Sequence, residues 1–314
     1  MSAPVLSIAL APRGHTRALH DGTVHPATCA FAFQEVPHII QAFRRMVRGL
    51  EFDVSEMALT TYLCARAHGV AFTALPIFPM RALHHGAIVV PARSDIRSPR
   101  DLEGRKVGVS RGYTVTTGVW ARAILQHEYD VDLRRITWVL SGDEHVTQYR
   151  PPANVVPIEA GQTLEAMLLS GEIAAAIGVQ MEPSAVRSLI PNPREVGMAA
   201  LRDRGLYPIN HTVVVRNDRL AEDPGRAADI FSAFVEAKHG YVERLRAGTI
   251  EQPSADDRFF KEVMDVIGDP LPYGIEPNRM MLNAIVRHAV EQGILPQAVR
   301  VEDLFPAATH ALAG

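Results

Sequence analysis

Residues 52–63 decide the fold class, and they read Phe52-Asp53-Val54-Ser55-Glu56-Met57-Ala58-Leu59-Thr60-Thr61-Tyr62-Leu63. We interpret the stretch as the end of a short strand, a serine that can cap, and an apolar-striped helix. That order predicts that Ser55 and Glu56 lie at the carboxyl edge of a sheet. Ligands of open α/β folds bind in the crevice just beyond such strand ends. The stretch therefore indicates a cleft protein and supplies two residues of the cleft floor.

Strand-like and helix-like segments alternate along the rest of the chain, which favours an α/β fold with largely parallel sheets. Strands are expected over 5–10, 27–33, 73–78, 87–90, 106–110, 136–140, 173–179 and 212–216. Helices are expected over 36–49, 115–128 and 163–170, with long amphipathic helices near the end of the chain. The strand at 87–90 is assigned to the same layer as the strands before it.

A polar break near residue 91 and a return near residue 206 divide this pattern into two lobes. We expect residues 1–90 and 207–314 to form a discontinuous first lobe, with residues 91–206 inserted as the second. Each lobe is expected to be a mostly parallel sheet flanked by helices. Two chain crossings would act as a hinge, and the cleft would lie between the lobes.

Composition excludes several classes of function. The 314 residues suffice for two domains, and 47% hydrophobic with 21% charged residues is typical of a soluble globular protein. A net charge of −3 favours neither a nucleic-acid partner nor an anionic membrane. Cys29 and Cys64 are too few for a disulfide framework and are interpreted as buried reduced thiols. The apolar run 5–10 follows no basic segment, so it is interpreted as a strand rather than a signal peptide, and a cytoplasmic protein is expected.

The order of elements is similar to the type II periplasmic binding protein fold, and six segments resemble one family more closely. These segments are Phe43-Arg44-Arg45-Met46, Glu51-Phe52-Asp53-Val54-Ser55-Glu56-Met57, Asp101-Leu102-Glu103-Gly104-Arg105-Lys106-Val107-Gly108-Val109, Gly142-Asp143-Glu144-His145-Val146, Tyr207-Pro208-Ile209-Asn210-His211-Thr212 and Asp269-Pro270-Leu271-Pro272-Tyr273-Gly274. Over nearly the whole chain they resemble the 4,5-dihydroxyphthalate decarboxylases of phthalate catabolism. The resemblance implies an aromatic acid decarboxylase that removes one carboxylate from 4,5-dihydroxyphthalate to give protocatechuate and carbon dioxide. The candidate residues below come from the sequence itself.

Such a decarboxylation needs a deprotonated phenol para to the leaving carboxylate and a general acid that protonates the ring carbon. His211 is a candidate because it follows a hinge-like crossing, and His145 because two acidic residues precede it after a strand end. Glu56 is the carboxylate candidate, since burial near the ring would raise its pKa and let it act as the acid. The alternatives stay open: a packed or surface histidine, and a helix-start carboxylate stabilised by the helix dipole.

Two kinds of anchor for the substrate carboxylates are expected. Residues 111–117 join a strand to a helix, so free N–H groups and threonine hydroxyls can form a carboxylate seat there, unless they serve only as a helix cap. Ser55 offers a second seat in the other lobe. Arginines beyond strand ends can grip a carboxylate with two parallel hydrogen bonds, unless they are solvated surface charges. The predicted substrate-binding residues are Arg13, Ser55, Arg81, Thr114, Thr116 and Thr117.

No nucleotide-binding glycine motif or pyridoxal lysine motif is recognised, so no cofactor is required by the sequence. A divalent metal is left open, with His84, His145 and His211 as candidate ligands. The expected partner is a small aromatic dicarboxylate, without nucleic acid or membrane, and a homo-oligomer is left open. The main competing function is a non-catalytic solute-binding protein for an aromatic carboxylate, which would share the fold and the anion seats. An enzyme of the thiamine-pyrimidine type receives little support, because no cysteine-rich segment resembles it.

Overall fold

The computed structural model describes residues 3–314 and divides them into two compact units. Unit 1 contains the residues up to Arg81, together with Ile209–Ala284 and Val299–Gly314, and unit 2 contains Ala82–Pro208 and Ile285–Ala298. The chain therefore passes between the units four times, where the sequence predicted two crossings. Residues 82–90 and 285–298, both assigned to the first lobe by the sequence, belong to unit 2.

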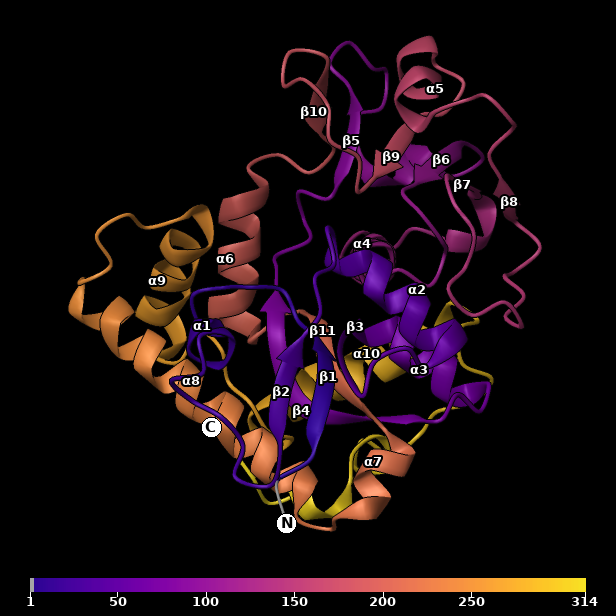
Figure 1. The fold of residues 1–314 in the computed structure, drawn as a ribbon. Coiled ribbons are helices and arrows are strands. Elements are labelled where there is room, and N and C mark those ends of the chain that lie inside the picture. The colour runs from indigo at the N-terminus through magenta and orange to yellow at the C-terminus, as the bar shows by residue number, and fades with distance from the viewer. Residues whose placement is uncertain (1–2) are drawn as a thin grey trace. The chain divides into compact units, whose positions relative to one another are not determined.

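Unit 1 is built on a five-stranded sheet with the strand order β2-β1-β3-β11-β4 (Figure 1). Its strands are β1 (Val5–Ala9), β2 (Ala30–Phe33), β3 (Val54–Ala58), β4 (Phe72–Arg81) and β11 (Ile209–Arg216). The first three pair in parallel, whereas β11 pairs antiparallel with both β3 and β4. The carboxyl ends of β1, β3 and β4 and the amino end of β11 consequently share one edge of the sheet.

The helices of unit 1 include α1 (Arg17–His20), α2 (Ile39–Gly49), α3 (Leu59–Ala67), α7 (Asn217–Glu222), α8 (Arg226–Ala247) and α9 (Ala255–Ile267). Two of them, α2 and α3, differ in detail from the sequence prediction. Gly49, expected to close α2, is still helical, and Leu50 takes the left-handed conformation with φ 48°. Helix α3 begins at Leu59 directly after β3, with Ala58 at its amino-cap position. Ser55 therefore lies inside a buried strand rather than at a helix start, so the predicted cap is wrong, and a contact of Ser55 with substrate stays a prediction.

Unit 2 is built on a six-stranded sheet with the order β10-β5-β9-β6-β7-β8. Its strands are β5 (Ile88–Pro91), β6 (Lys106–Val109), β7 (Thr137–Leu140), β8 (Val155–Pro157), β9 (Ala175–Ile177) and β10 (Val186–Ser188). Strands β9, β6, β7 and β8 run parallel, and β5 pairs antiparallel with β9 and β10. The assignment of residues 87–90 to the first layer is wrong, because β5 pairs with two strands of this second sheet. Both sheets combine parallel and antiparallel pairs, and the α/β fold is as predicted.

The helices of unit 2 are α4 (Thr116–Tyr129), α5 (Leu164–Ser170), α6 (Pro193–Arg204) and the carboxyl half of α10 (Arg279–Glu291), whose first residues belong to unit 1. The helices predicted over 115–128 and 163–170 agree with α4 and α5 within one residue. The Oγ1 of Thr163 accepts a hydrogen bond of 3.2 Å from the Ala166 amide at the start of α5. Gly171, with φ 79°, ends the helix. No helix within residues 3–314 is long and apolar enough to span a bilayer.

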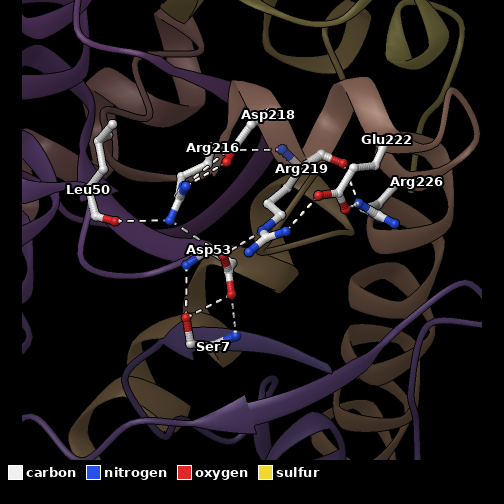
Figure 2. Close-up of polar contacts among 8 residues, drawn as sticks. All are labelled: Ser7, Leu50, Asp53, Arg216, Asp218, Arg219, Glu222 and Arg226. Carbon is white, nitrogen blue, oxygen red and sulfur yellow. Dashed lines mark hydrogen bonds and ion pairs between the residues drawn. The ribbon is translucent and has the colours of Figure 1, made fainter. Parts of the chain in front are cut away.

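A carboxylate fixes the amino end of β3 (Figure 2). One oxygen of Asp53 accepts hydrogen bonds from the amide and the hydroxyl of Ser7, at 2.8 and 2.9 Å. The other accepts one of 2.8 Å from Nε of Arg219, and Arg216 lies at 3.7 Å. Glu222 extends the network, since it pairs with Arg219. Asp53 thus ties β1 and β3 to β11 and α7.

Candidate functional site

Three of the candidate residues lie at the edge of the unit 1 sheet where β1, β3 and β4 end. Ala9 at the end of β1 is paired with Ser55, so Glu56 projects from β3 just beyond the end of β1. His211 pairs with Ala58, and Ile209 pairs with Arg81, the last residue of β4. The strand register therefore brings Glu56, His211 and Arg81 to one edge, as expected for a ligand site in an α/β fold.

Glu56 is the centre of a buried charged cluster at this edge, together with Arg13 and His211. Arg13 Nη1 and Nη2 donate to the two carboxylate oxygens at 2.8 and 2.7 Å, a bidentate pair. His211 Nδ1 lies 2.5 Å from Oε1, and the Ala11 amide donates to Oε2 at 3.1 Å. The Glu56 side chain is fully buried, and Phe43 contacts the His211 ring edge-on with centroids 5.0 Å apart. Every oxygen of the carboxylate is thus held by at least two donors.

These partners decide the ionisation of Glu56. Burial alone would raise its pKa, but the positive charge of Arg13 and the hydrogen bonds from His211 and Arg13 outweigh that effect. The pKa of Glu56 is held well below its ordinary range, so the side chain is a carboxylate at neutral pH. The expectation that burial would make Glu56 the general acid is therefore wrong. Arg13, predicted to grip the substrate, is already paired with Glu56.

The loop after β1 is packed closely against helices α8 and α9. A Cβ atom at Gly14 would lie 2.3 Å from Cε2 of Tyr241, so only glycine fits at that position. His15 is buried between the rings of Tyr241 and Phe260, with centroids 5.8 and 6.0 Å away. Burial, and then the charge of Arg13, lower the pKa of His15 to about 3. His15 is therefore a neutral part of the wall behind Arg13.

Two hollows of unit 1 open on either side of this loop. The first has a volume of about 620 Å³ and is lined by Arg13, His15 and Tyr241 among others. The second, of about 770 Å³, is lined by Leu10 and Phe33 at strand ends and by the first residues of α2. Sequence reasoning missed the second hollow, although a strand that ends at 33 before a helix that begins at 39 is the signal for such a crevice.

Arg81 is buried at the same edge, and its recorded contacts bind it to the segment 272–278. Its Nη2 donates to the side-chain oxygen of Asn278 and, at 3.2 Å, to the carbonyl of Pro272. Lys238 is a neighbouring buried cation that sequence reasoning did not select. Its Nζ donates to Asp269 at 2.7 Å and lies 5.1 Å from the centre of the Tyr273 ring. Arg81 is therefore a buried cation at this edge, whereas the charge of Lys238 is balanced by Asp269.

The carboxylate seat predicted at residues 111–117 exists in unit 2, and the protein's own Glu144 occupies it. Glu144 accepts hydrogen bonds from the amide of Tyr113, from the amide of Thr114 at 3.2 Å and from Thr114 Oγ1 at 2.6 Å. Thr116 is buried at the start of α4, and Thr117 follows it half-buried. The seat has the predicted chemistry, while its use by a substrate stays a prediction.

The remaining candidates also lie in unit 2. His145 and His84 are buried there, and the neighbouring His85 pairs with Glu128 at 3.2 Å. Metal binding by His84, His145 and His211 stays a prediction, because His211 belongs to unit 1. Within residues 3–314, the group with the spacing of metal ligands consists of His127, His288 and Glu291 instead.

Comparison with solved structures defines the class of fold. The aliphatic sulphonate binding protein SsuA from Escherichia coli is 13% identical, with a TM-score of 0.56, over 99% of this chain and 100% of that one. The desulfurization enzyme DszB is 15% identical, with a TM-score of 0.53, over 98% and 97% of the two chains. Likeness at this level of identity shows a periplasmic-binding-protein fold, as predicted, and no particular activity.

Sequence comparison identifies the family. A 4,5-dihydroxyphthalate decarboxylase from Comamonas testosteroni is 29% identical over 326 residues, which cover 97% of each chain. A protein of the same name from Pseudomonas putida is 33% identical over 183 residues, which cover 55% of this chain and 69% of that one. No protein-family model matches the chain. The chain belongs to the family of the 4,5-dihydroxyphthalate decarboxylases, as its sequence segments indicated.

Proposed function

We propose that this protein is a carboxy-lyase that converts 4,5-dihydroxyphthalate into protocatechuate and carbon dioxide. The relationship to the named decarboxylases, which extends over 97% of the chain, is the observation that carries the proposal. The buried cluster of Arg13, Glu56 and His211 supports it, because it supplies a histidine suited to proton transfer.

The substrate brings most of the chemistry itself. Each of its two carboxylates stands para to one hydroxyl, and the two halves of the molecule are equivalent, so loss of either carboxylate gives the same product. A deprotonated hydroxyl pushes its electron pair into the ring, and the ring carbon that bears the para carboxylate takes up a proton. The bond to the carboxylate then breaks, its electron pair restores the aromatic ring, and carbon dioxide leaves. One proton is consumed for each carboxylate lost.

His211 is proposed to deliver that proton. The hydrogen bond from Nδ1 to Glu56 fixes the ring orientation, and Nε2 is the nitrogen proposed to exchange the proton. The ionised carboxylate stabilises the imidazolium that forms in each cycle, as carboxylates do in other histidine dyads. Glu56 is thus a positioning residue, and His211 is the proposed catalytic residue.

Arg13 sets the charge of the cluster. With neutral His211, the positive Arg13 and negative Glu56 cancel, and protonation of His211 leaves one net positive charge. A cluster that alternates between neutral and positive suits a dianionic substrate better than one with a net negative charge. Direct contacts of the substrate with Arg81, Thr114, Thr116 and Thr117, a role for His145, and cytoplasmic location remain predictions.

The proposal is tested by incubating the purified protein with 4,5-dihydroxyphthalate and separating the products by chromatography. Formation of protocatechuate with equimolar carbon dioxide is expected. Phthalate, which lacks both hydroxyls, is the matched control and should bind without reacting. Recovery of all the diacid intact from a saturated complex would instead identify a solute-binding protein.

A further inference from the structure

Three potential metal ligands outside the proposed active site meet in unit 2. His127 lies near the end of α4, and His288 and Glu291 lie one turn apart on α10. Their ligand atoms all lie within 4.8 Å of one another. His127 Nε2 is 2.8 Å from Glu291 Oε2, and His288 Nδ1 is 3.2 Å from the same oxygen. Two imidazole nitrogens thus converge on one carboxylate oxygen.

The surroundings keep these side chains in place and leave them accessible. The ring of Trp120 contacts the His288 ring edge-on, with centroids 5.5 Å apart, and His288 is buried. The side chain of His127 is 38% exposed and that of Glu291 is 28% exposed, so an ion can enter from solvent. Arg287 approaches the other carboxylate oxygen, Oε1, at 3.8 Å, a weak pair that does not occupy Oε2.

We propose that His127 Nε2, His288 Nδ1 and Glu291 bind one divalent transition-metal ion of the zinc class. Two imidazoles and a carboxylate are a ligand set that Zn²⁺, Co²⁺, Ni²⁺ and Cu²⁺ accept, and water completes the coordination. The ligand nitrogens must lose their hydrogens, which a neutral imidazole achieves by moving its proton to the other ring nitrogen.

The ion would tie the end of α4 to the carboxyl half of α10. Binding to the folded state alone stabilises a protein by an amount that grows with the logarithm of metal concentration over the dissociation constant. The site is thus assigned to the stability of unit 2, and it has no part in the decarboxylation proposed above.

Trp120 provides the reporter for a direct test. Protein treated with a chelator and then freed of it is titrated with Co²⁺ while tryptophan fluorescence and visible absorption are recorded. Saturable quenching with one ion per chain is expected, and Zn²⁺ should reverse it by competition. His127→Ala, at a half-exposed position, should weaken Co²⁺ binding at least tenfold. His239→Ala removes an exposed histidine from α8 and should bind as the unchanged protein does.

Glu291→Gln gives a second, independent variant, and it too should weaken binding at least tenfold. Melting curves without metal check that each variant is folded. The proposal is overturned by quenching that does not saturate, or by equal Co²⁺ affinity in the unchanged protein and the folded His127→Ala and Glu291→Gln variants.

Discussion

His211 Nδ1 lies 2.5 Å from Glu56 Oε1, and the two residues are diagonal neighbours on adjacent antiparallel strands. Glu56 stands opposite Val213, and His211 is two residues away on the same face of β11. Because the two strands are central in the sheet, backbone hydrogen bonds on both sides fix this distance. The dyad is therefore positioned by sheet register rather than by a flexible loop.

Replacement of His211 by Ala or Gln tests its role as proton carrier. If His211 delivers the ring proton, kcat should fall by about 10²- to 10⁴-fold, the usual contribution of a general acid. Substrate affinity, measured by calorimetry, should change much less. His25→Ala, at an exposed position in the same unit, is the control. Equal turnover in both variants would remove His211 from the mechanism.

Glu56→Gln should destabilise unit 1 and not only slow the reaction. The substitution leaves Arg13 with its charge mostly buried and uncompensated, which costs about 3 kcal/mol of unfolding free energy. Urea denaturation measures this loss, and Arg13→Met with Glu56→Leu in one protein should recover part of it. An unchanged denaturation midpoint in Glu56→Gln would contradict the pairing.

The pairing of Glu56 with Arg13 also predicts that the free energy of unfolding falls at low pH. The folded-state pKa of Glu56 is depressed, so its contribution to stability is present above its unfolded pKa of about 4.3 and is lost as pH falls below that value. In Glu56→Gln, the fall in unfolding free energy below about pH 4 should be shallower than in the unchanged protein.

His15 adds a pH dependence in a different window. Its pKa is lowered to about 3 in the folded protein, against about 6.5 when unfolded, so the unfolded state binds the extra proton between these values. Stability is therefore lost as pH falls from about 6.5 towards 3, with a slope of up to about 1.4 kcal/mol per pH unit from this residue. His15→Gln should flatten the slope between pH 6 and 4, measured by urea denaturation. His25→Gln should leave it unchanged.

A substitution at Gly112 tests whether Glu144 occupies the carboxylate seat at Thr114. A Cβ atom at Gly112 would lie 2.7 Å from Glu144 Oε2, so Gly112→Ala should displace the carboxylate and lower the melting temperature. Glu144→Ala should also lower it, because the amide of Thr114 loses its acceptor. In the double variant, alanine at 112 meets no carboxylate, so the two losses should be smaller together than their sum. Strict additivity would show that the clash is relieved elsewhere.

Arg81 is either an anchor for the second carboxylate or a support for the segment 272–278. If it is an anchor, Arg81→Ala should weaken binding of the diacid far more than binding of the monoacid product. Asn278→Ala removes its partner but keeps the cation, and should affect both ligands alike. Calorimetric titrations of both ligands decide the matter, and identical profiles for the two variants would leave Arg81 a structural role.

The prediction from sequence was most accurate where the signal is local. The predicted helix over 163–170 agrees with α5 within one residue, since the Thr163 cap and Gly171 both act through adjacent backbone groups. It failed at Ser55, because β3 passes into α3 without a turn residue and a buried serine resembles a cap. It failed for residues 87–90, because a short apolar strand carries no information about which sheet it joins.

The candidate site shows the same limit. Glu56 was selected by its position at a predicted strand end and His211 by the hinge-like segment before it, and the family segments contained both. The pairing of Glu56 with Arg13, 43 residues earlier in the chain, depends on tertiary structure and reversed the expected pKa shift. Glu144 occupies the carboxylate seat at Thr114 although it lies 30 residues away in the sequence, and no local pattern around Thr114 predicts this contact.

Two carboxylates hold strand β3 in place: Asp53, just before the strand, contacts Ser7 and Arg219, and Glu56, at its middle, contacts Arg13 and His211. A slip of β3 by one residue would turn each carboxylate to the opposite face and separate both from their partners at once. Misaligned versions of the sheet are thus penalised twice during folding. We expect single-residue insertions or deletions between positions 53 and 56 to be the least tolerated length changes in unit 1.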